Sequence, residues 1–356
     1  MNAASGPRVL MLTKAGPTGA SSRLRALQHI PLFEAAGMPV RAVFRTTPDA
    51  EGRFAASQSR HGPAYRLAEW PHRLRYGRAL LGGLRWCQAV FLQRRFLGRT
   101  LMGFCRATGR KIVYDFDDAL FVDPDRRRDS ALGDFQACLR AAAVVVAGND
   151  YLADYARKFN PEVRVVPTAV PARPHTPHGR RPGRFVLGWI GTATNIPYLH
   201  MLDGALRELS AAVPGLVLKV ISARPVEIEG LRVENVAWRL ATADQELADC
   251  DVGLMPLPDD EFTRGKCAFK ALQCMSLGLP VVVSPVGMNR QAVADGREGF
   301  WAETDRQWVE AALRLWRDPE LAARMGAAAH ARAQEFTVER IGAGLVEIFR
   351  GLRRPG

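Results

Sequence analysis

The 356-residue sequence has no apolar run long enough to cross a bilayer, which takes about 18 residues. Its longest apolar runs are the size of residues 141–147. The apolar stretch at residues 9–12 ends at Thr13-Lys14 and is too short for the core of a signal peptide. We therefore expect neither a membrane span nor an exported product, and we place the protein in the cytoplasm.

Paired cysteines are also lacking. The six cysteines form no C-x-x-C motif and have no histidine cluster beside them, so neither a zinc site nor a redox dithiol is expected. We expect reduced, buried side chains that pack as small apolar groups. These residues are Cys87, Cys105, Cys138, Cys250, Cys267 and Cys274.

The dinucleotide-binding pattern is missing as well. The turn after the first predicted strand, residues 14–19, lacks G-x-G-x-x-G spacing and contains Pro17. No Tyr-x-x-x-Lys pair stands in a suitable place. These absences argue against an NAD-dependent oxidoreductase or epimerase. Because no nucleic-acid-binding motif is present either, a nucleic-acid partner is not expected.

Acidic residues are scarce in the first half. Residues 1–180 hold 28 Lys and Arg against 14 Asp and Glu (net +14), whereas residues 181–356 hold 21 against 22 (net −1). Residues 41–111 alone carry 15 basic and 3 acidic side chains. Such a field favours an anionic partner, which could be a phosphorylated lipid, an acidic membrane surface or nucleic acid. The alternative is that a GC-rich genome encodes arginine at most positively charged surface positions. In agreement with this, only six of the 49 basic residues are lysine.

What is present is an alternation of short apolar runs and longer amphipathic stretches, which predicts parallel sheets covered by helices. In the first half we expect strands near 8–13, 40–45, 87–93, 111–115, 144–147 and 163–167, and helices near 22–36, 72–85, 97–108, 131–141 and 149–159. In the second half we expect strands near 185–190, 216–222, 251–256 and 280–284, and helices near 196–212, 243–249, 265–277, 305–316 and 319–334.

The boundary between the halves is rich in proline. Residues 171–184 contain four prolines, two glycines and few apolar residues, which is typical of a linker. We expect an N-terminal domain over 1–170, a linker over 171–184, and a C-terminal domain over 185–336. The last amphipathic stretch, within 337–356, is expected to fold back on the N-terminal domain. Two such domains would leave a cleft between them.

Two segments of the second half suit a phosphate-bearing ligand. The turn at 190–195 follows a strand, and its Gly191 lets backbone approach a phosphate, although strand–glycine turns are common in ordinary folds. Lys266 and Lys270 stand at an i, i+4 spacing that would put both on one face of a helix, with Gln273 continuing that face. Two ammonium groups near a helix start favour a diphosphate; the alternative is a solvated basic face.

A third segment is acidic. Asp115, Asp117 and Asp118 lie at the end of the fourth predicted strand. They are suited to position an acceptor hydroxyl or to take its proton, or to bind a divalent metal. Alternatively, they cap the next helix and pair with nearby arginines.

Four stretches together resemble the retaining GT-B glycosyltransferases of the family-four-like type (glycosyl transferases group 1). They are KCAFKALQCMSLGLPVVVSPVGMNRQAVADGREGFW, LGWIGTATNIPYL, ADCDVGLMPLPDDEF and KIVYDFDDALF, and their order fits that family from about residue 8 to 350. The resemblance implies an α/β chain of GT-B architecture, with two Rossmann-like domains. It also implies a bacterial enzyme of cell-envelope polysaccharide synthesis.

The resemblance implies a nucleotide-sugar donor bound by the second half, with no cofactor and no metal. Loops after the strands meet the diphosphate, the sugar and the base, although Trp238 fits a core position equally well. The matching donor-binding residues are Gly191, Thr192, Trp238, Arg239, Arg264, Lys266, Lys270, Gln273, Val286 and Gly287.

In the first half, the resemblance implies a glycine-containing loop facing the diphosphate and the acceptor, formed by Gly19, Ser21, Ser22 and Arg23. The residues expected to act in catalysis are Asp117, Asp118, Lys266 and Gln273. The acceptor would be a glycan, a lipid-linked sugar or a small molecule. The leucines and arginines of residues 72–85 further suggest docking at the inner face of an anionic membrane.

The chain departs from the family at several positions. Relatives carry an Arg and a Lys in the first loop of the second half, where this chain has Thr192 and Asn195. Their pair of glutamates is replaced by Gly265 and Gln273, and their histidine after the fourth strand by Asp117. The alternative to an active transferase is therefore an inactive nucleotide-sugar-binding partner subunit of the same fold.

Overall fold

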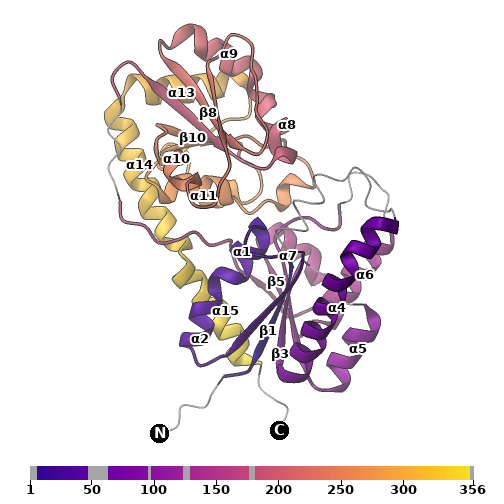
Figure 1. Ribbon diagram of the computed structural model, residues 1–356. Coiled ribbons are helices and arrows are strands. Elements are labelled where there is room, and N and C mark those ends of the chain that lie inside the picture. Colours follow the sequence, from indigo (N-terminus) through magenta and orange to yellow (C-terminus); the bar gives the residue numbers. More distant parts are fainter. Residues whose placement is uncertain (1–5, 47–62, 95–97, 123–128, 176–180, 353–356) are drawn as a thin grey trace. The chain divides into compact units, whose positions relative to one another are not determined.

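The computed structural model describes residues 6–46, 63–94, 98–122, 129–175 and 181–352. The chain forms two compact units (Figure 1). The first unit holds residues up to Thr168 together with those from Val338 onward, and the second unit holds Ala169–Thr337. Residues 171–175 and 181–184 of the predicted linker belong to the second unit, where Arg173 pairs with Asp244, and residues 176–180 lie outside the described part.

The first unit is built on a six-stranded sheet of order β2-β1-β3-β4-β5-β6, and every pairing in it is parallel. Buried β-branched and aromatic residues fill its central strands, as expected for a sheet covered on both faces. The strands are β1 (Val9–Ala15), β2 (Val40–Thr46), β3 (Ala89–Gln93), β4 (Lys111–Phe116), β5 (Val144–Ala147) and β6 (Val163–Val165).

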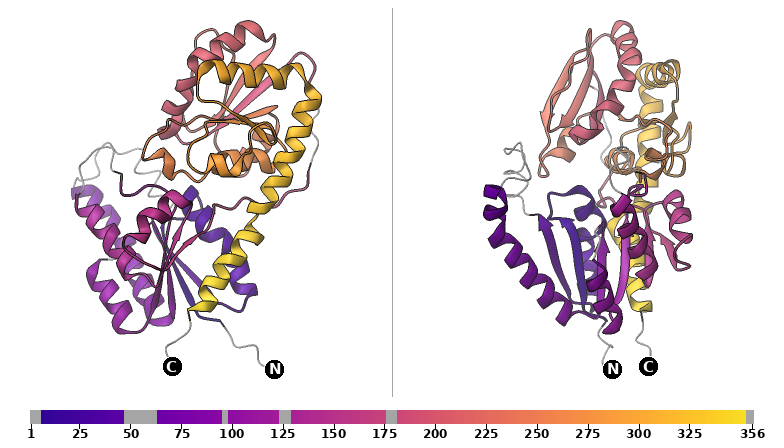
Figure 2. Two further views of the ribbon diagram at one scale, coloured as in Figure 1. Left: turned by 180° about the vertical axis from the view of Figure 1, so that it is seen from behind. Right: turned by 90° about the vertical axis from the view of Figure 1, so that its right-hand side faces the viewer.

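Helices cover both faces of this sheet, as the right-hand view in Figure 2 shows. They are α1 (Ala20–Arg25), α2 (Ile30–Ala35), α4 (Pro63–Trp86), α5 (Arg99–Ala107), α6 (Asp129–Ala141), α7 (Asp150–Arg157) and α15 (Val338–Gly351), with a 3-10 helix η1 (Leu27–His29). The last helix, α15, buries Leu345, Val346 and Phe349 in the core of the first unit. The C-terminal segment is thus part of the N-terminal core.

The second unit repeats the plan, with a fully parallel sheet of order β12-β11-β10-β7-β8-β9. Its strands are β7 (Phe185–Ile190), β8 (Leu216–Ser222), β9 (Val233–Ala237), β10 (Val252–Met255), β11 (Val281–Val283) and β12 (Gly299–Trp301). Its α-helices are α8 (Ile196–Leu199), α9 (Asp203–Ala212), α10 (Ala243–Ala248), α11 (Phe269–Ser276), α12 (Asn289–Ala292), α13 (Asp305–Arg317) and α14 (Pro319–Ala333). Its 3-10 helices are η2 (Ala193–Asn195), η3 (His200–Leu202), η4 (Thr263–Gly265) and η5 (Gln334–Phe336).

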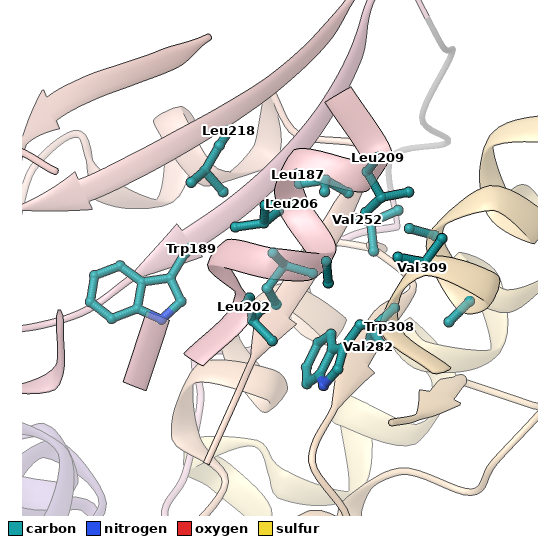
Figure 3. Packing of buried hydrophobic residues seen from close by; sticks show 14 of the residues in the cluster. Leu187, Trp189, Leu202, Leu206, Leu209, Leu218, Val252, Val282, Trp308 and Val309 are labelled. Carbon is teal, nitrogen blue, oxygen red and sulfur yellow. The ribbon is translucent and has the colours of Figure 1, made fainter. Parts of the chain in front are cut away.

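The core of the second unit lies between the sheet and helices α9 and α13. Leu187 and Leu218 from neighbouring strands pack with Leu206 and Val309 from these helices (Figure 3). Trp189 belongs to the same cluster. This core fixes β7, whose carboxyl end carries the glycine turn noted in the sequence.

Three predicted helices are interrupted. The stretch 22–36 forms α1, η1 and α2, and 196–212 forms α8, η3 and α9, because Pro31 and Pro197 each start a new helix. The prediction for 265–277 is wrong in its first turn, since α11 begins only at Phe269, after Ala268 in the left-handed region (φ +52°). The short strands β9 and β12 lie outside the strand ranges predicted above.

The six cysteines are free and buried, which confirms the expectation of packed thiols. Among the described helices, none combines the length and the apolar character needed to span a membrane.

We predict that Phe349→Ala destabilises the first unit. Phe349 is fully buried, with edge-to-face contacts to Phe33 and Phe91 at centroid distances of 5.1 and 5.8 Å. Truncating such a ring costs about 3–5 kcal/mol through lost burial and the cavity left behind. Urea unfolding should show an earlier transition for Phe349→Ala, while Glu347→Ala on the exposed side of α15 should change the free energy of unfolding by less than about 0.5 kcal/mol. Equal effects of the two substitutions would contradict the packing of α15.

Candidate functional site

Each sheet has one position where the chain connections leave in opposite directions. In the second unit this switch point lies between β7 and β10, and in the first unit between β1 and β3. In open parallel sheets, ligands bind beyond the carboxyl ends of the strands at such points. The candidate residues fall into two clusters, one at each switch point, and we describe each cluster within its own unit.

The cluster of the second unit is centred on Gly191, directly after β7. A β-carbon at Gly191 would lie 3.0 Å from Lys270 Nζ and 2.5 Å from the ring of Trp189, so glycine is required for this close approach. The Lys270 ammonium lies 4.7 Å from the centroid of the Trp189 ring. α11 therefore brings a cation directly to the turn at the end of β7.

Lys266 lies near Lys270, but not in the way that its spacing predicted. Its backbone is extended (ψ 142°) and precedes α11, so the two lysines do not share a helix face. The Lys266 ammonium lies 4.3 Å from the centroid of the Phe262 ring. Burial, and then the charge of Lys266, lower the pKa of Lys270 to about 7. The two ammonium groups thus repel each other, which an anionic ligand would relieve.

Arg264 and Gly287 meet on the same side of the unit. Gly287 is in the left-handed region (φ +53°), and a β-carbon there would lie 2.5 Å from the carbonyl oxygen of Arg264. The turn of Val286 and Gly287 therefore packs directly on η4. The Arg264 side chain, about half exposed, donates to Asp259 at 2.7 Å.

The other predicted donor residues have local partners. Thr192 bonds to Thr194 (2.9 Å between hydroxyls) and accepts from Asn195 at 3.1 Å. Gln273 donates to Asp244 at 2.7 Å, so its amide nitrogen is held by a neighbouring carboxylate. Trp238 is half-buried and Arg239 exposed, directly after β9. Because the sheet is parallel, these loops lie at the same edge as Gly191.

The cluster of the first unit joins three strand ends. Arg94, directly after β3, pairs with Asp118 at 2.7 Å and with Asp117 at 3.6 Å, and it donates to the hydroxyl of Ser21 at 3.0 Å. Although burial lowers the pKa of Arg94, Asp117 and Asp118 outweigh it and hold that pKa above its ordinary value. Arg94 also has a left-handed backbone (φ +48°), which is costly for a non-glycine residue.

Asp115, the first carboxylate of the acidic segment, has a structural role. It is fully buried and accepts from Arg25 Nη2 at 2.5 Å and from Nε at 3.3 Å. Arg25 also donates to the carbonyl oxygen of Val166 at 2.7 Å. Burial raises the pKa of Asp115 to about 6 in spite of Arg25. This ion pair anchors α1 to β4 and leaves Asp117 and Asp118 as the acidic groups at the strand end.

The predicted glycine loop builds the start of α1. A β-carbon at Gly19 would lie 2.4 Å from that of Ala15, so the turn needs glycine. Ser22 is buried and accepts from the backbone of Ala15 at 3.1 Å, which closes the turn. Arg23 donates to the carbonyl oxygen of Pro17 at 2.8 Å. Ser21 contacts the arginine–carboxylate cluster through its bond to Arg94, whereas the bonds of Ser22 and Arg23 described above shape the loop.

Sequence reasoning missed Arg94. Its position could have indicated it, because Arg94 directly follows the buried strand β3, and β3 pairs with β4, the strand that Asp117 follows. A metal site is not apparent either: within the described ranges, no group of three His, Cys, Asp or Glu side chains is arranged to hold an ion.

We predict that the Lys270 amine titrates near pH 7 and that Lys266→Met raises its pKa, because the neighbouring charge is removed. The measurement is NMR of ¹³C-methylated lysines, with Lys270→Arg to assign the signal among the six lysines. Since the folded-state pKa lies below 10.5, the unfolded chain binds the proton more tightly between pH 7 and 10.5. The free energy of unfolding should therefore rise with pH in that window. Six amines that all titrate above pH 9 would refute this electrostatic description.

Comparisons with known proteins show which sequences and folds this chain resembles. Residues 184–318 match the family model of glycosyl transferases group 1. A D-inositol 3-phosphate glycosyltransferase of Rhodococcus erythropolis is 27% identical over 190 residues, which are 48% of this chain and 42% of that protein. The chain thus spans less than half the length of this curated relative.

Three solved structures share the fold over nearly the whole chain, each at 16% identity. Sucrose-phosphate synthase from Thermosynechococcus elongatus has a TM-score of 0.72, with 97% of this chain and 98% of that chain covered. WaaG, a glycosyltransferase of lipopolysaccharide biosynthesis, has 0.66 (96% and 100%), and Anabaena HepE in complex with UDP and glucose has 0.65 (96% and 99%). The resemblance seen in the sequence is therefore confirmed for residues 184–318, which match glycosyl transferases group 1, and the two parallel sheets are those of the GT-B fold.

Proposed function

We propose that this chain is a glycosyltransferase that binds a nucleotide sugar through its second unit and transfers the sugar, with retention, to an acceptor hydroxyl. The observation that carries this proposal is the approach of Lys270 to Gly191 at the end of β7, with Lys266 nearby. It lies inside the region that matches the family model. A diphosphate is the ligand class that two closely spaced ammonium groups and a glycine turn suit best.

The lysines would stabilise the leaving group. Transfer breaks the bond between the anomeric carbon and the diphosphate oxygen, so negative charge grows on the phosphate as the sugar becomes cationic. Cations that are already fixed by α11 and by the loop before it oppose that charge without reorganising. We expect no metal to be needed, because lysine and arginine supply the positive charge; this expectation stays a prediction.

Retention is supported by the resemblance and by the chemistry of the site. The acceptor oxygen would attack the face from which the diphosphate leaves, and the departing phosphate oxygen would take the acceptor proton. One bond to the anomeric carbon forms as the other breaks, and no strong protein base is required. This route tolerates Gly265 and Gln273 in place of the two glutamates of relatives.

We assign the acceptor to the cluster of the first unit. Asp118 and Asp117 are oriented by Arg94, and the Ser21 hydroxyl stands beside them. Carboxylates that are held by an arginine remain acceptors for sugar hydroxyl groups. The acceptor alcohol would belong to a glycan, a lipid-linked sugar or a small molecule. The predicted compartment remains the cytoplasm.

The inactive partner subunit is the less favoured reading. Its support was the loss of the glutamate pair and of the basic residues in the first loop. Lys270 instead brings a cation to that loop from α11. The relatives and structures named above are described as glycosyltransferases or as a synthase. Because HepE is described in complex with UDP-glucose, we would test UDP-sugars first, and then GDP-, ADP- and dTDP-sugars.

We predict that Lys266→Ala and Lys270→Gln each weaken binding and use of the nucleotide sugar about 10- to 150-fold. The reason is the loss of a charge-assisted bond to phosphate, which is worth roughly 1.5–3 kcal/mol. Calorimetry with the free nucleoside diphosphate and donor-turnover kinetics measure the effect. Lys158→Ala, an exposed lysine of the first unit, is the matched control. Unchanged kinetics in folded Lys266 and Lys270 variants would remove the diphosphate assignment.

We predict a different defect for Asp117→Asn and Asp118→Asn. If the first cluster holds the acceptor, sugar transfer should fall about tenfold or more, while slow donor hydrolysis and nucleotide affinity stay unchanged. Lys270→Gln should lower both transfer and hydrolysis. Product analysis with a panel of acceptors separates the two rates. Parallel losses of hydrolysis and transfer in the aspartate variants would place these carboxylates on the donor instead.

A further inference from the structure

The exposed side of α4 carries large apolar side chains that no described residue covers. Trp70 is 59% exposed, Leu74 49% and Leu81 52%. Their spacing of i, i+4 and i+11 places all three within a narrow arc of the helix, since each residue advances by about 100°. We call this arc, with its flanking arginines Arg73, Arg78 and Arg85, the α4 stripe.

The structure separates Leu74, Leu80, Leu81 and Leu84 of α4 into two sets, which corrects the expectation that they all serve one surface. Leu80 and Leu84 are 8% and 1% exposed and pack toward the sheet. A β-carbon at Gly83 would lie 2.6 Å from Leu10 on β1, so this side of the helix is in tight contact. The buried set accounts for the packing of α4 on its own unit. Leu74 and Leu81 are not needed for that packing.

Apart from Glu69, which directly precedes Trp70, the charge along the stripe is of one sign. Between Trp70 and Tyr114 the sequence has ten basic residues and no acidic residue. Arg73, Arg78 and Arg85 are exposed on α4, on either side of the apolar arc. A solvated helix would not need apolar side chains at its outermost positions, and a like-charged second copy would be repelled by the same field.

The patch continues onto α5. Phe104 is 39% exposed, and the guanidinium of Arg110 lies 5.2 Å from the centroid of its ring. Arg110 also donates to the carbonyl oxygen of Leu84 at the end of α4, at 2.5 Å. A second element thus adds an aromatic ring and a cation to the end of the stripe.

We propose that the α4 stripe docks the protein on an anionic phospholipid membrane. Trp70, Leu74 and Leu81 enter the boundary between headgroups and acyl chains, while Arg73, Arg78 and Arg85 contact lipid phosphates. Nucleic acid is a poorer match, because a phosphate backbone offers nothing to three exposed apolar side chains. The inference goes beyond the proposed function and does not depend on it, although membrane docking would place a lipid-linked acceptor within reach.

The test is flotation of the full-length protein with vesicles of phosphatidylcholine alone, or with one third of the lipid replaced by phosphatidylglycerol. We expect binding to the anionic vesicles at low salt, little binding to neutral ones, and release at about 0.5 M salt, where charges are screened beyond a few ångströms. Absence of binding to anionic vesicles at low salt, or equal binding to neutral ones, overturns the proposal.

Three variants separate the stripe from general charge. Arg73→Gln, Arg78→Gln and Arg85→Gln together should lower the partition coefficient about 100-fold, since each arginine at an acidic surface contributes roughly a factor of five. Leu74→Ser with Leu81→Ser should lower it about tenfold or more even at low salt. The control replaces Arg207, Arg317 and Arg324, exposed residues of the second unit, by Gln and loses the same net charge.

The control variant should bind like the original protein, within about twofold. Equal losses in the control and the stripe variants would mean that net charge alone is responsible, and the proposal would fail. Stripe variants should keep their melting temperature and their nucleotide affinity, because these side chains are exposed and lie on the first unit. The proposal would also be overturned if the protein bound single-stranded RNA more tightly than vesicles. The same holds if it formed a dimer that Leu74→Ser with Leu81→Ser dissociates.

Discussion

Parallel pairing of the strands is the constraint on which both clusters depend. Every pairing in the two described sheets is parallel. Between two such strands a crossover must therefore carry the chain back to the end of the sheet at which the strands begin. All strands of one sheet therefore end at the same edge. Gly191 after β7, Trp238 after β9 and the turn at Gly287 after β11 share an edge for this reason, although up to 96 residues separate them in the chain. The polar residues gather there because the strands themselves are buried and apolar.

The position of Lys270 depends on how closely α11 approaches the sheet. Gly253 on β10 pairs with Gly188 on β7, and a β-carbon at Gly253 would lie 2.5 Å from the sulfur of Cys274 on α11. At Gly188 it would lie 2.6 Å from the sulfur of Cys250. Small residues on β10 and α11 let the helix pack closely. Burial raises the pKa of both the Cys274 and the Cys250 thiols, that of Cys250 to about 12, so these cysteines act as apolar packing groups. Gly253 and Cys274 are thus part of what sets the lysine in place, whereas Gly188 and Cys250 pack the turn after α10 against β7.

The two clusters differ in their electrostatics. In the first unit three strand-end carboxylates share two arginines: Asp115 pairs with Arg25, and Asp117 and Asp118 both pair with Arg94. Such a cluster is nearly neutral and is stabilised by its own contacts, and removing one partner of the buried Arg25–Asp115 pair would leave a costly unpaired charge. In the second unit, Lys270 and Lys266 are close enough to repel each other. The first arrangement orients hydrogen-bond acceptors, whereas the second is suited to an anion that arrives from solution.

Much of this organisation was predictable from local patterns. Buried parallel strands are short apolar runs and their crossovers are amphipathic, so the alternation predicts two α/β sheets, and polar residues after strands predict where ligands bind. The sequence also determined the +14 charge of the first half. Only the tertiary structure decided that Ala268 interrupts the lysine helix, that Arg94 joins Asp118, and that Leu74 and Leu81 face outward while Leu80 and Leu84 are buried. These features arise from contacts between residues far apart in the chain. A local sequence pattern does not show which distant partner such a residue contacts.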